Sequence, residues 1–173
     1  DVIISAVDAN GSFTKDVFVQ AKDGAKTCGI KLYIPTRADG KLVTDLKPGT
    51  HVNVKGTVKW WHPKAGEISD KNYPTKKHIK ELAKATITVL TSGVAPTPVD
   101  VTVAQLTDKA TADSYEDLYV KIKAVAVAKI SAADPKYKNV DVMVVDKAGK
   151  SMEVRDDLYP VSSLKELGCT DVT

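Results

Sequence analysis

Cysteine is scarce in this sequence, which has only Cys28 and Cys169 in 173 residues. Two cysteines are too few for a disulfide-rich scaffold, and no spacing of Cys and His residues suggests a zinc site. No apolar run approaches the roughly 20 residues of a membrane-spanning helix. We therefore expect no membrane span, no metal and no cofactor. Because the chain begins at Asp1 rather than Met, we expect a processed protein or an excised fragment, and the missing leader says nothing about export.

Neither positive nor negative residues are in large excess. The sequence has 25 Lys and Arg residues against 22 Asp and Glu residues, a formal net charge of +3. This balance is mildly basic and falls short of that of a dedicated nucleic-acid binder. The proportions of apolar residues (43%) and charged residues (27%) are typical of a globular chain that can bury a core.

Motifs of catalysis are also missing. The three histidines, His51, His62 and His78, have no serine or cysteine nucleophile motif beside them. There is no P-loop and no dinucleotide-binding fingerprint. We expect no catalytic residues. No feature of the sequence specifically supports the hypothesis that the protein is an enzyme.

Strand signals dominate what the sequence does contain. Runs rich in β-branched and aromatic residues, several of them alternating in polarity with a period of two, indicate short β-strands. These runs lie at 2–7, 16–21, 29–34, 51–61, 85–90, 99–103, 117–129, 139–146 and 151–156.

Helical signals are fewer and shorter. A helical turn is expected near 103–110, and a serine cap, a leucine pair and a final glycine predict a short helix at 163–167. Residues 75–85 also fit a helix, with Ile79 and Leu82 on one face. Strands and helices together predict an all-β fold with short helices.

The two halves of the chain resemble each other. The stretch DVFVQAKDGAKT (16–27) aligns with DVMVVDKAGKS (141–151) after one gap. An offset of about 125 residues indicates two copies of one β-rich unit, with chance similarity between short strand–turn–strand stretches as the alternative. A Pro-rich spacer at 93–99 then divides a first unit, 1–92, from a second, 100–173.

The first half resembles a known family. VIISAVDANGSFTKDVFVQAKDG, GIKLYIP and DLKPGTHVNVKGTVKWW are similar to the OB-fold-like modules found, often in tandem, in secreted bacterial proteins. Residues 47–58 match the K-x-G-x-x-V-x-V-x-G-x-V pattern of the fourth strand. The resemblance implies a five-stranded OB-like barrel over 1–92 and an extracellular or periplasmic location. Nothing after Pro160 matches that pattern, so we expect the second barrel to be incomplete or atypical.

Trp60 and Trp61 are the only tryptophans and stand side by side in a predicted strand. Neighbouring strand residues face opposite sides. Trp60 shares the parity of the valines and is expected to plug the barrel, while Trp61 faces outward unless a bulge at Gly56 resets the phase. The residues predicted to face inward are Val17, Val19, Ile30, Leu32, Val52, Val54, Val58 and Trp60.

The loop that follows Trp61 is the candidate ligand site. In OB folds, the loops between strands one and two and between strands four and five flank the binding face. Aromatic stacking contributes roughly 1–3 kcal/mol per base, and interleaved lysines suit a polyanion. As alternatives, Trp61 packs under its own loop and the lysines form a solvated face. The candidate ligand-binding residues are Lys59, Trp61, His62, Tyr73, Lys76, Lys77 and Lys80.

Two functional hypotheses follow. The first is a non-catalytic binding module of an exported bacterial protein that holds an extended polymer, single-stranded nucleic acid or glycan. The second is a structural or assembly subunit. In that case an open β edge in the second unit would recruit a protein partner or a second copy of the chain.

Cys28 and Cys169 are a candidate disulfide. A bond between them would tie the C-terminal tail to the first unit. It would close a loop of about 140 residues, for which chain entropy gives a stabilisation on the order of 5 kcal/mol. Two buried free thiols are the alternative.

Overall fold

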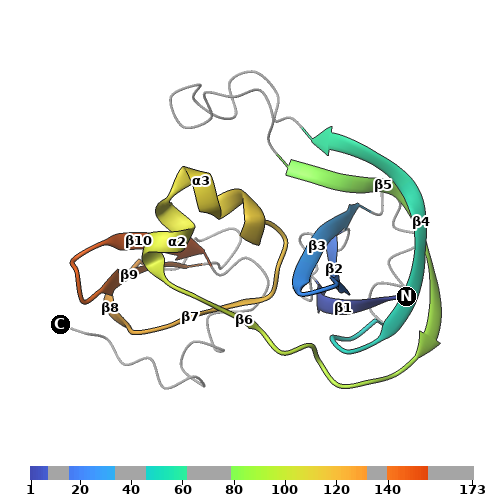
Figure 1. Ribbon diagram of the computed structural model, residues 1–173, viewed down its shortest axis with the longest axis horizontal. Helices are drawn as coiled ribbons and strands as arrows, with labels where there is room; N and C mark the ends of the chain where they lie inside the picture. The colour runs from blue at the N-terminus through green and yellow to red at the C-terminus, as the bar shows by residue number, and fades with distance from the viewer. Residues whose placement is uncertain (8–15, 34–45, 62–78, 132–139, 156–173) are drawn as a thin grey trace.

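Five strands form a closed barrel in the order β1-β2-β3-β5-β4 (Figure 1). The structure is a computed structural model that describes residues 1–7, 16–33, 46–61, 79–131 and 140–155. The strands of the barrel are β1 (Val2–Val7), β2 (Asp16–Asp23), β3 (Lys26–Tyr33), β4 (His51–Trp61) and β5 (Ile79–Thr91).

The barrel has one parallel seam. All other neighbouring strands pair antiparallel, whereas β3 and β5 run parallel. Their contact is short, because only Lys31, Leu32 and Tyr33 pair with Glu81, Leu82 and Ala83. The first part of β3, Lys26–Ile30, extends past this seam, so its outer side is available to other parts of the chain.

Apolar side chains of alternating parity fill the barrel. Val17 and Val19 of β2 face the same interior as Leu32 of β3, as the strand periodicity predicts. The fold is therefore all-β with short helices, as expected from the sequence. The buried members of this core are Ile4, Val7, Val17, Val19, Leu32, Leu46, Val52 and Ile87, with Ile30 and Val54 partly buried against them.

The prediction that Trp60 plugs the barrel is wrong. Trp60 is 41% exposed and Val58 is 53% exposed. Among the described strands, β1 pairs with β4 at Val52 and His51, and the second half of β4 pairs with β5. Beyond Val54, β4 therefore continues with β5 as a two-stranded arm that extends past the other described strands of the barrel (Figure 1).

A bulge lies beside Gly56, but the extra residue is on β5. Between Lys55 and Thr57 of β4, the facing part of β5 contains one residue more. Lys84 there adopts a left-handed φ of 53°, in keeping with a bulged strand. A Cβ on Gly56 would approach Leu82 Cγ to 2.8 Å, so glycine is required where the arm bends.

The part of the chain after the first unit, described over residues 99–131 and 140–155 and beginning one residue before the expected boundary, has smaller sheets. β8, β9 and β10 form a three-stranded sheet, and β6 and β7 form a parallel pair. Its buried core (Val103, Val140, Val142, Val144) shares no residue with the core of the barrel. Residues 92–98 between them belong to no strand or helix. The elements of this unit are β6 (Val99–Val101), α2 (Val103–Thr107), α3 (Lys109–Ala112), η2 (Asp113–Tyr115), β7 (Val120–Ile122), β8 (Val125–Ile130), β9 (Asp141–Asp146) and β10 (Ser151–Arg155).

Local sequence signals in this region had mixed outcomes. The helical turn near 103–110 is confirmed. Thr102 caps its N-terminus and forms a capping box with Gln105. The helix expected over 75–85 is wrong for residues 79–85, because pairing with two neighbouring strands overrides helix propensity there. The strand expected over 117–129 breaks at Ala124, whose φ is 56°. Residues 163–167 lie outside the described part of the chain.

Candidate functional site

Four charged side chains of alternating sign cross the outer face of the barrel. The ammonium group of Lys31 lies 3.7 Å from the carboxylate of Asp16 and 3.5 Å from that of Glu81. The ammonium group of Lys59 lies 3.5 Å from the other oxygen of Glu81. These four residues, one each on β2, β3, β5 and β4, are called the charged row.

Glu81 is the fully buried centre of this row. Neither of its carboxylate oxygens has a hydrogen-bond partner among the described residues, so the two lysines supply its compensation. The side chain of Lys31 is 12% exposed and that of Lys59 is 51% exposed. Because removing one partner of a buried ion pair strands the other charge, Glu81 and Lys31 fix the parallel seam between β5 and β3.

An aromatic ring lies beside the row. The ammonium group of Lys59 is 5.8 Å from the centroid of the Tyr33 ring, within the range of a cation–π contact. Lys59 and Tyr33 therefore place a cation and an aromatic face together on the outer surface.

The structure separates two of the predicted ligand residues. Lys59 pairs with Glu81, whereas Lys80 pairs with Trp60, so Lys59 and Lys80 lie on opposite faces of the β4–β5 arm. Trp61 ends β4 opposite Ile79. The side chain of Trp61, and the residues His62, Tyr73, Lys76 and Lys77, lie outside the described part of the chain.

Sequence reasoning missed the neighbours of Lys59. Glu81 and Tyr33 come from strands whose parallel pairing brings them near it, and no local pattern announces such a pairing. A partial signal was present, since Lys31 and Tyr33 share the outward parity of β3 opposite the inward Leu32.

A segment of the second unit crosses the same outer face. We call residues 116–120 the strap. The carboxylate of Glu116 lies near the backbone N–H of Lys80 on β5, which favours its charged form. The next carboxylate oxygen, Asp117 Oδ2, accepts a hydrogen bond of 2.8 Å from the backbone N–H of Lys31 on β3.

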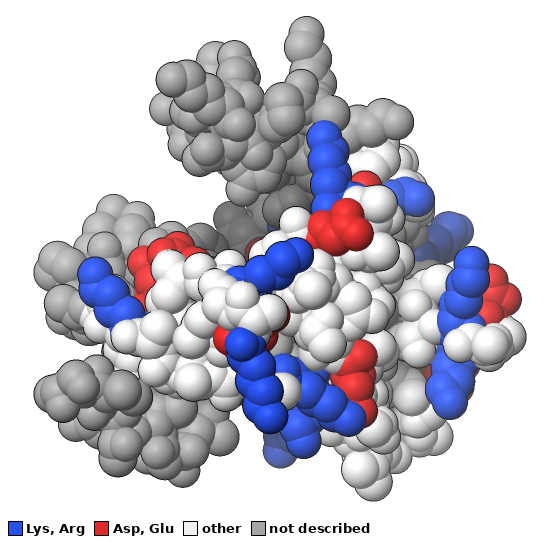
Figure 2. All heavy atoms as spheres, turned by 60° about the vertical axis from the view of Figure 1, so that its left-hand side comes forward, with Lys and Arg blue, Asp and Glu red and all other residues white. Residues whose placement is uncertain are grey.

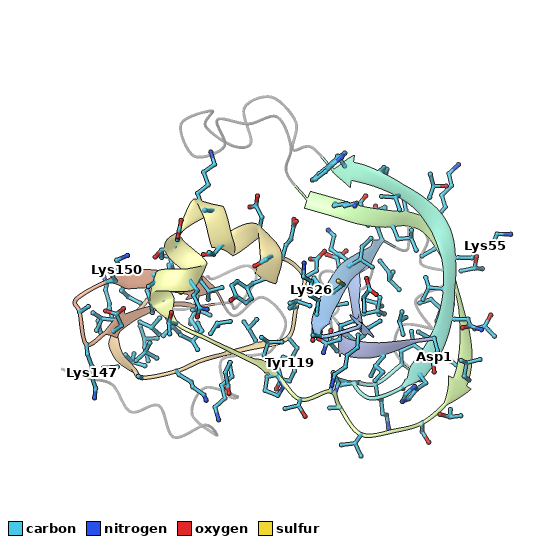
Figure 3. The ribbon with its side chains drawn as sticks, in the orientation of Figure 1. Asp1, Lys26, Lys55, Tyr119, Lys147 and Lys150 are labelled. Carbon is cyan, nitrogen blue, oxygen red and sulfur yellow. The ribbon has the colours of Figure 1, made fainter. Side chains whose placement is uncertain are left out.

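The strap continues over β3 to β2. A Cβ on Gly29 would lie 2.4 Å from the carbonyl oxygen of Asp117, so only glycine admits the strap at this distance. On the next strand, β2, Oε1 of the buried Gln20 accepts a hydrogen bond of 3.2 Å from the backbone N–H of Tyr119. Figure 1 shows the connection from η2 to β7 passing beside β3, and in Figure 3 Lys26 and Tyr119 mark this side of the barrel.

Two open hollows flank the strap. One, of about 590 Å³, is lined by residues 25–30 and 113–118, with Lys80 and Val99. The other, of about 400 Å³, lies between the strap and Ser5, Ala6 and Phe18. The exposed Cys28 lines the first hollow, and Cys169 lies outside the described residues, so their pairing stays a prediction.

Burial of the strap perturbs its carboxylates. Burial raises the pKa of Asp117 to about 6, although the hydrogen bond from Lys31 opposes the shift. Burial also raises the pKa of Glu116 above its ordinary value, against the opposing effect of the backbone N–H of Lys80. Asp117 adopts a left-handed φ of 58°, a conformation that aspartate tolerates better than most residues.

On the face of the molecule shown in Figure 2, Lys and Arg side chains lie among Asp and Glu side chains. Among the described residues, no group of three or more His, Cys, Asp or Glu side chains is arranged to hold a metal ion. In the same part of the chain, no helix has the length and apolar character to cross a membrane. Comparison with protein-family models, with curated proteins and with solved structures gives no match to this chain.

Proposed function

We propose that the chain is a non-catalytic binding module built on an OB-type barrel. The observation that carries this proposal is the strand order β1-β2-β3-β5-β4 with a parallel seam between β3 and β5. A five-stranded Greek-key barrel of this kind is the framework on which OB folds bind oligonucleotides and oligosaccharides.

The proposed binding face is the outer surface of β2 and β3, continued by Lys59 on β4. It carries Tyr33, Lys31 and Phe18, and the β4–β5 loop begins beside it at Trp61. The ligand is an extended polymer, single-stranded nucleic acid or glycan, and the module needs no cofactor. The resemblance of the first half to modules of secreted bacterial proteins supports an extracellular or periplasmic location.

The charge of the face narrows the ligand chemistry. The charged row contains two acids and two lysines, so it provides no net positive field. Phosphate neutralisation at this row is therefore weak, and aromatic stacking supplies most of the attraction. A ligand held in this way binds with a shallow dependence on salt unless the lysines of 71–84 contribute.

A second candidate function is assembly through a sheet edge. Among the described strands, β10 pairs only with β9, so its other side offers backbone N–H and C=O groups to a further strand. Val154 on β10 is exposed beside this edge. Such an edge supports recruitment of a protein partner or of a second copy by strand addition.

Light scattering on the whole chain, with and without a dT15 oligonucleotide or a soluble oligosaccharide, separates the two functions. A monomer that gains the mass of the added polymer supports the binding module. An oligomer whose mass is indifferent to both additions supports the assembly subunit and counts against the first proposal.

A further inference from the structure

We propose that the strap is a built-in occupant of the binding face, so that docking of the second unit and binding of an extended polymer across β2 and β3 exclude each other. The inference rests on the proposed function for the identity of the competing ligand. The contact between strap and barrel stands on the geometry alone.

The path of the strap is the first argument. It contacts β5 at Lys80, β3 at Gly29 and Lys31, and β2 at Gln20, and then borders β1 at Ala6. It thus crosses successive strands over the outer face, the course that an extended polymer must follow to contact several strands at once. The two cannot occupy this surface together, because a Cβ on Gly29 would already meet the strap backbone at 2.4 Å.

The chemistry of the contact is the second argument. Asp117 accepts a hydrogen bond from the backbone N–H of Lys31 on β3, and the preceding carboxylate, Glu116, lies near the backbone N–H of Lys80 on the neighbouring β5. Phosphate, sulfate and carboxylate oxygens accept hydrogen bonds from the same groups. The strap therefore fills acceptor positions that an acidic polymer lying across the face would take.

The attachment of the strap is the third argument. Residues 116–119 form no strand ladder with the barrel, and the hydrogen bonds that hold them there among the described residues are made with Lys31 and Gln20. Open hollows lie on both sides of the strap. Residues 92–98, which join the two units, belong to no strand or helix. A contact of this kind opens by separation of the two units and leaves both cores intact.

The test uses the whole chain and the variant Asp117→Gly. Glycine keeps the left-handed φ of 58° without strain and removes the carboxylate, so the fold is preserved while the contact with Lys31 is lost. Asp113→Ala is the matched control, because it removes an exposed carboxylate from the neighbouring η2 that makes no hydrogen bond or ion pair with the barrel among the described residues. Its electrostatic effect on the strap is a repulsion of Glu116 and does not involve Lys31 or Tyr119. The two readouts are amide hydrogen exchange at Lys31 and Tyr119 and the affinity for fluorescein-labelled dT15.

We expect Asp117→Gly to exchange at least tenfold faster at both amides and to bind dT15 severalfold more tightly, with Asp113→Ala unchanged in both. Unchanged exchange in Asp117→Gly would overturn the strap as a reversible contact, whether or not dT15 binds. Faster exchange with unchanged affinity, in a chain that does bind, would overturn the competition. Faster exchange in a chain that never binds dT15 or an oligosaccharide would sustain the opening of the strap, overturn the competition, and contradict the polymer-binding function itself.

Discussion

Asp117 lies directly over Gly29, close enough that a single added carbon on the glycine would meet the aspartate carbonyl at 2.4 Å. These residues are 88 positions apart in the sequence and belong to different units of the chain. Their contact shows that the barrel and the second unit share a fitted surface on the outer side of β3.

This contact predicts the effect of Gly29→Ala. The new methyl group meets backbone atoms, which cannot rotate away, so the strap must shift. We expect a destabilisation of about 1–3 kcal/mol, the usual range for overpacking, and faster proteolysis within 92–98 as the units separate. Urea unfolding and timed proteolysis measure the two effects. Thr27→Ser, a small change on the same strand face, is the control, and an equal response from it would show that the glycine contact is not the cause.

The charged row predicts unequal effects at its members. Glu81→Gln removes the buried charge that compensates Lys31, whereas Lys59→Met removes a half-exposed partner. We expect losses in the free energy of unfolding of about 3 kcal/mol for Glu81→Gln and below about 1 kcal/mol for Lys59→Met. Urea denaturation of both variants provides the comparison. Equal losses in the free energy of unfolding would mean that the buried ion pair between Glu81 and Lys31 contributes no more to stability than the half-exposed pair between Glu81 and Lys59.

The pKa of Asp117 predicts a dependence on pH. Its pKa is raised from 3.8 to about 6 in the folded chain, so the folded state binds this proton more tightly than the unfolded state. The resulting stabilisation is fully present below pH 3.8 and is lost as the pH rises through 6. After allowance for solvent screening of a partly exposed group, we expect a contribution of about 1–2 kcal/mol between pH 4 and 7.

Asp117→Asn isolates this contribution, because asparagine tolerates the same left-handed backbone and does not titrate. Unfolding free energies measured from pH 4 to 7 should fall less steeply for this variant than for the unmodified chain. Identical slopes would place the titration elsewhere, and Glu116→Gln then tests the neighbouring carboxylate, whose pKa is also raised.

The sequence predicted what depends on local pattern and failed where distant strands decide. Alternation predicted the buried Val17, Val19 and Leu32, because parity along a strand is a local property. It misplaced Trp60, since parity says nothing about where the opposite wall of a barrel ends. It also read residues 79–85 as a helix, because the pairing that makes them a strand comes from β3 and β4.

The candidate site was predictable to a similar degree. Lys59 was identified from its strand position, but its partners Glu81 and Tyr33 depend on the parallel seam. The strap could not be foreseen, because its sequence reads as the start of a strand and its contacts lie on strands 86 and 99 residues away.

The central claim is that the outer face of the barrel binds polymer, and the adjacent tryptophans test it most directly. Trp60 and Lys59 lie on opposite faces of the β4–β5 arm, whereas the position of Trp61 has the same parity as Lys59. Anisotropy of labelled dT15, and of a labelled oligosaccharide in parallel, gives the affinity of the whole chain and of the variants Trp60→Ala and Trp61→Ala. We predict that Trp61→Ala weakens binding by at least about fivefold, as the loss of one stacked ring implies, and that Trp60→Ala leaves it unchanged. The account would be contradicted if the chain bound neither probe. It would also be contradicted if Trp60→Ala lowered the affinity as much as Trp61→Ala.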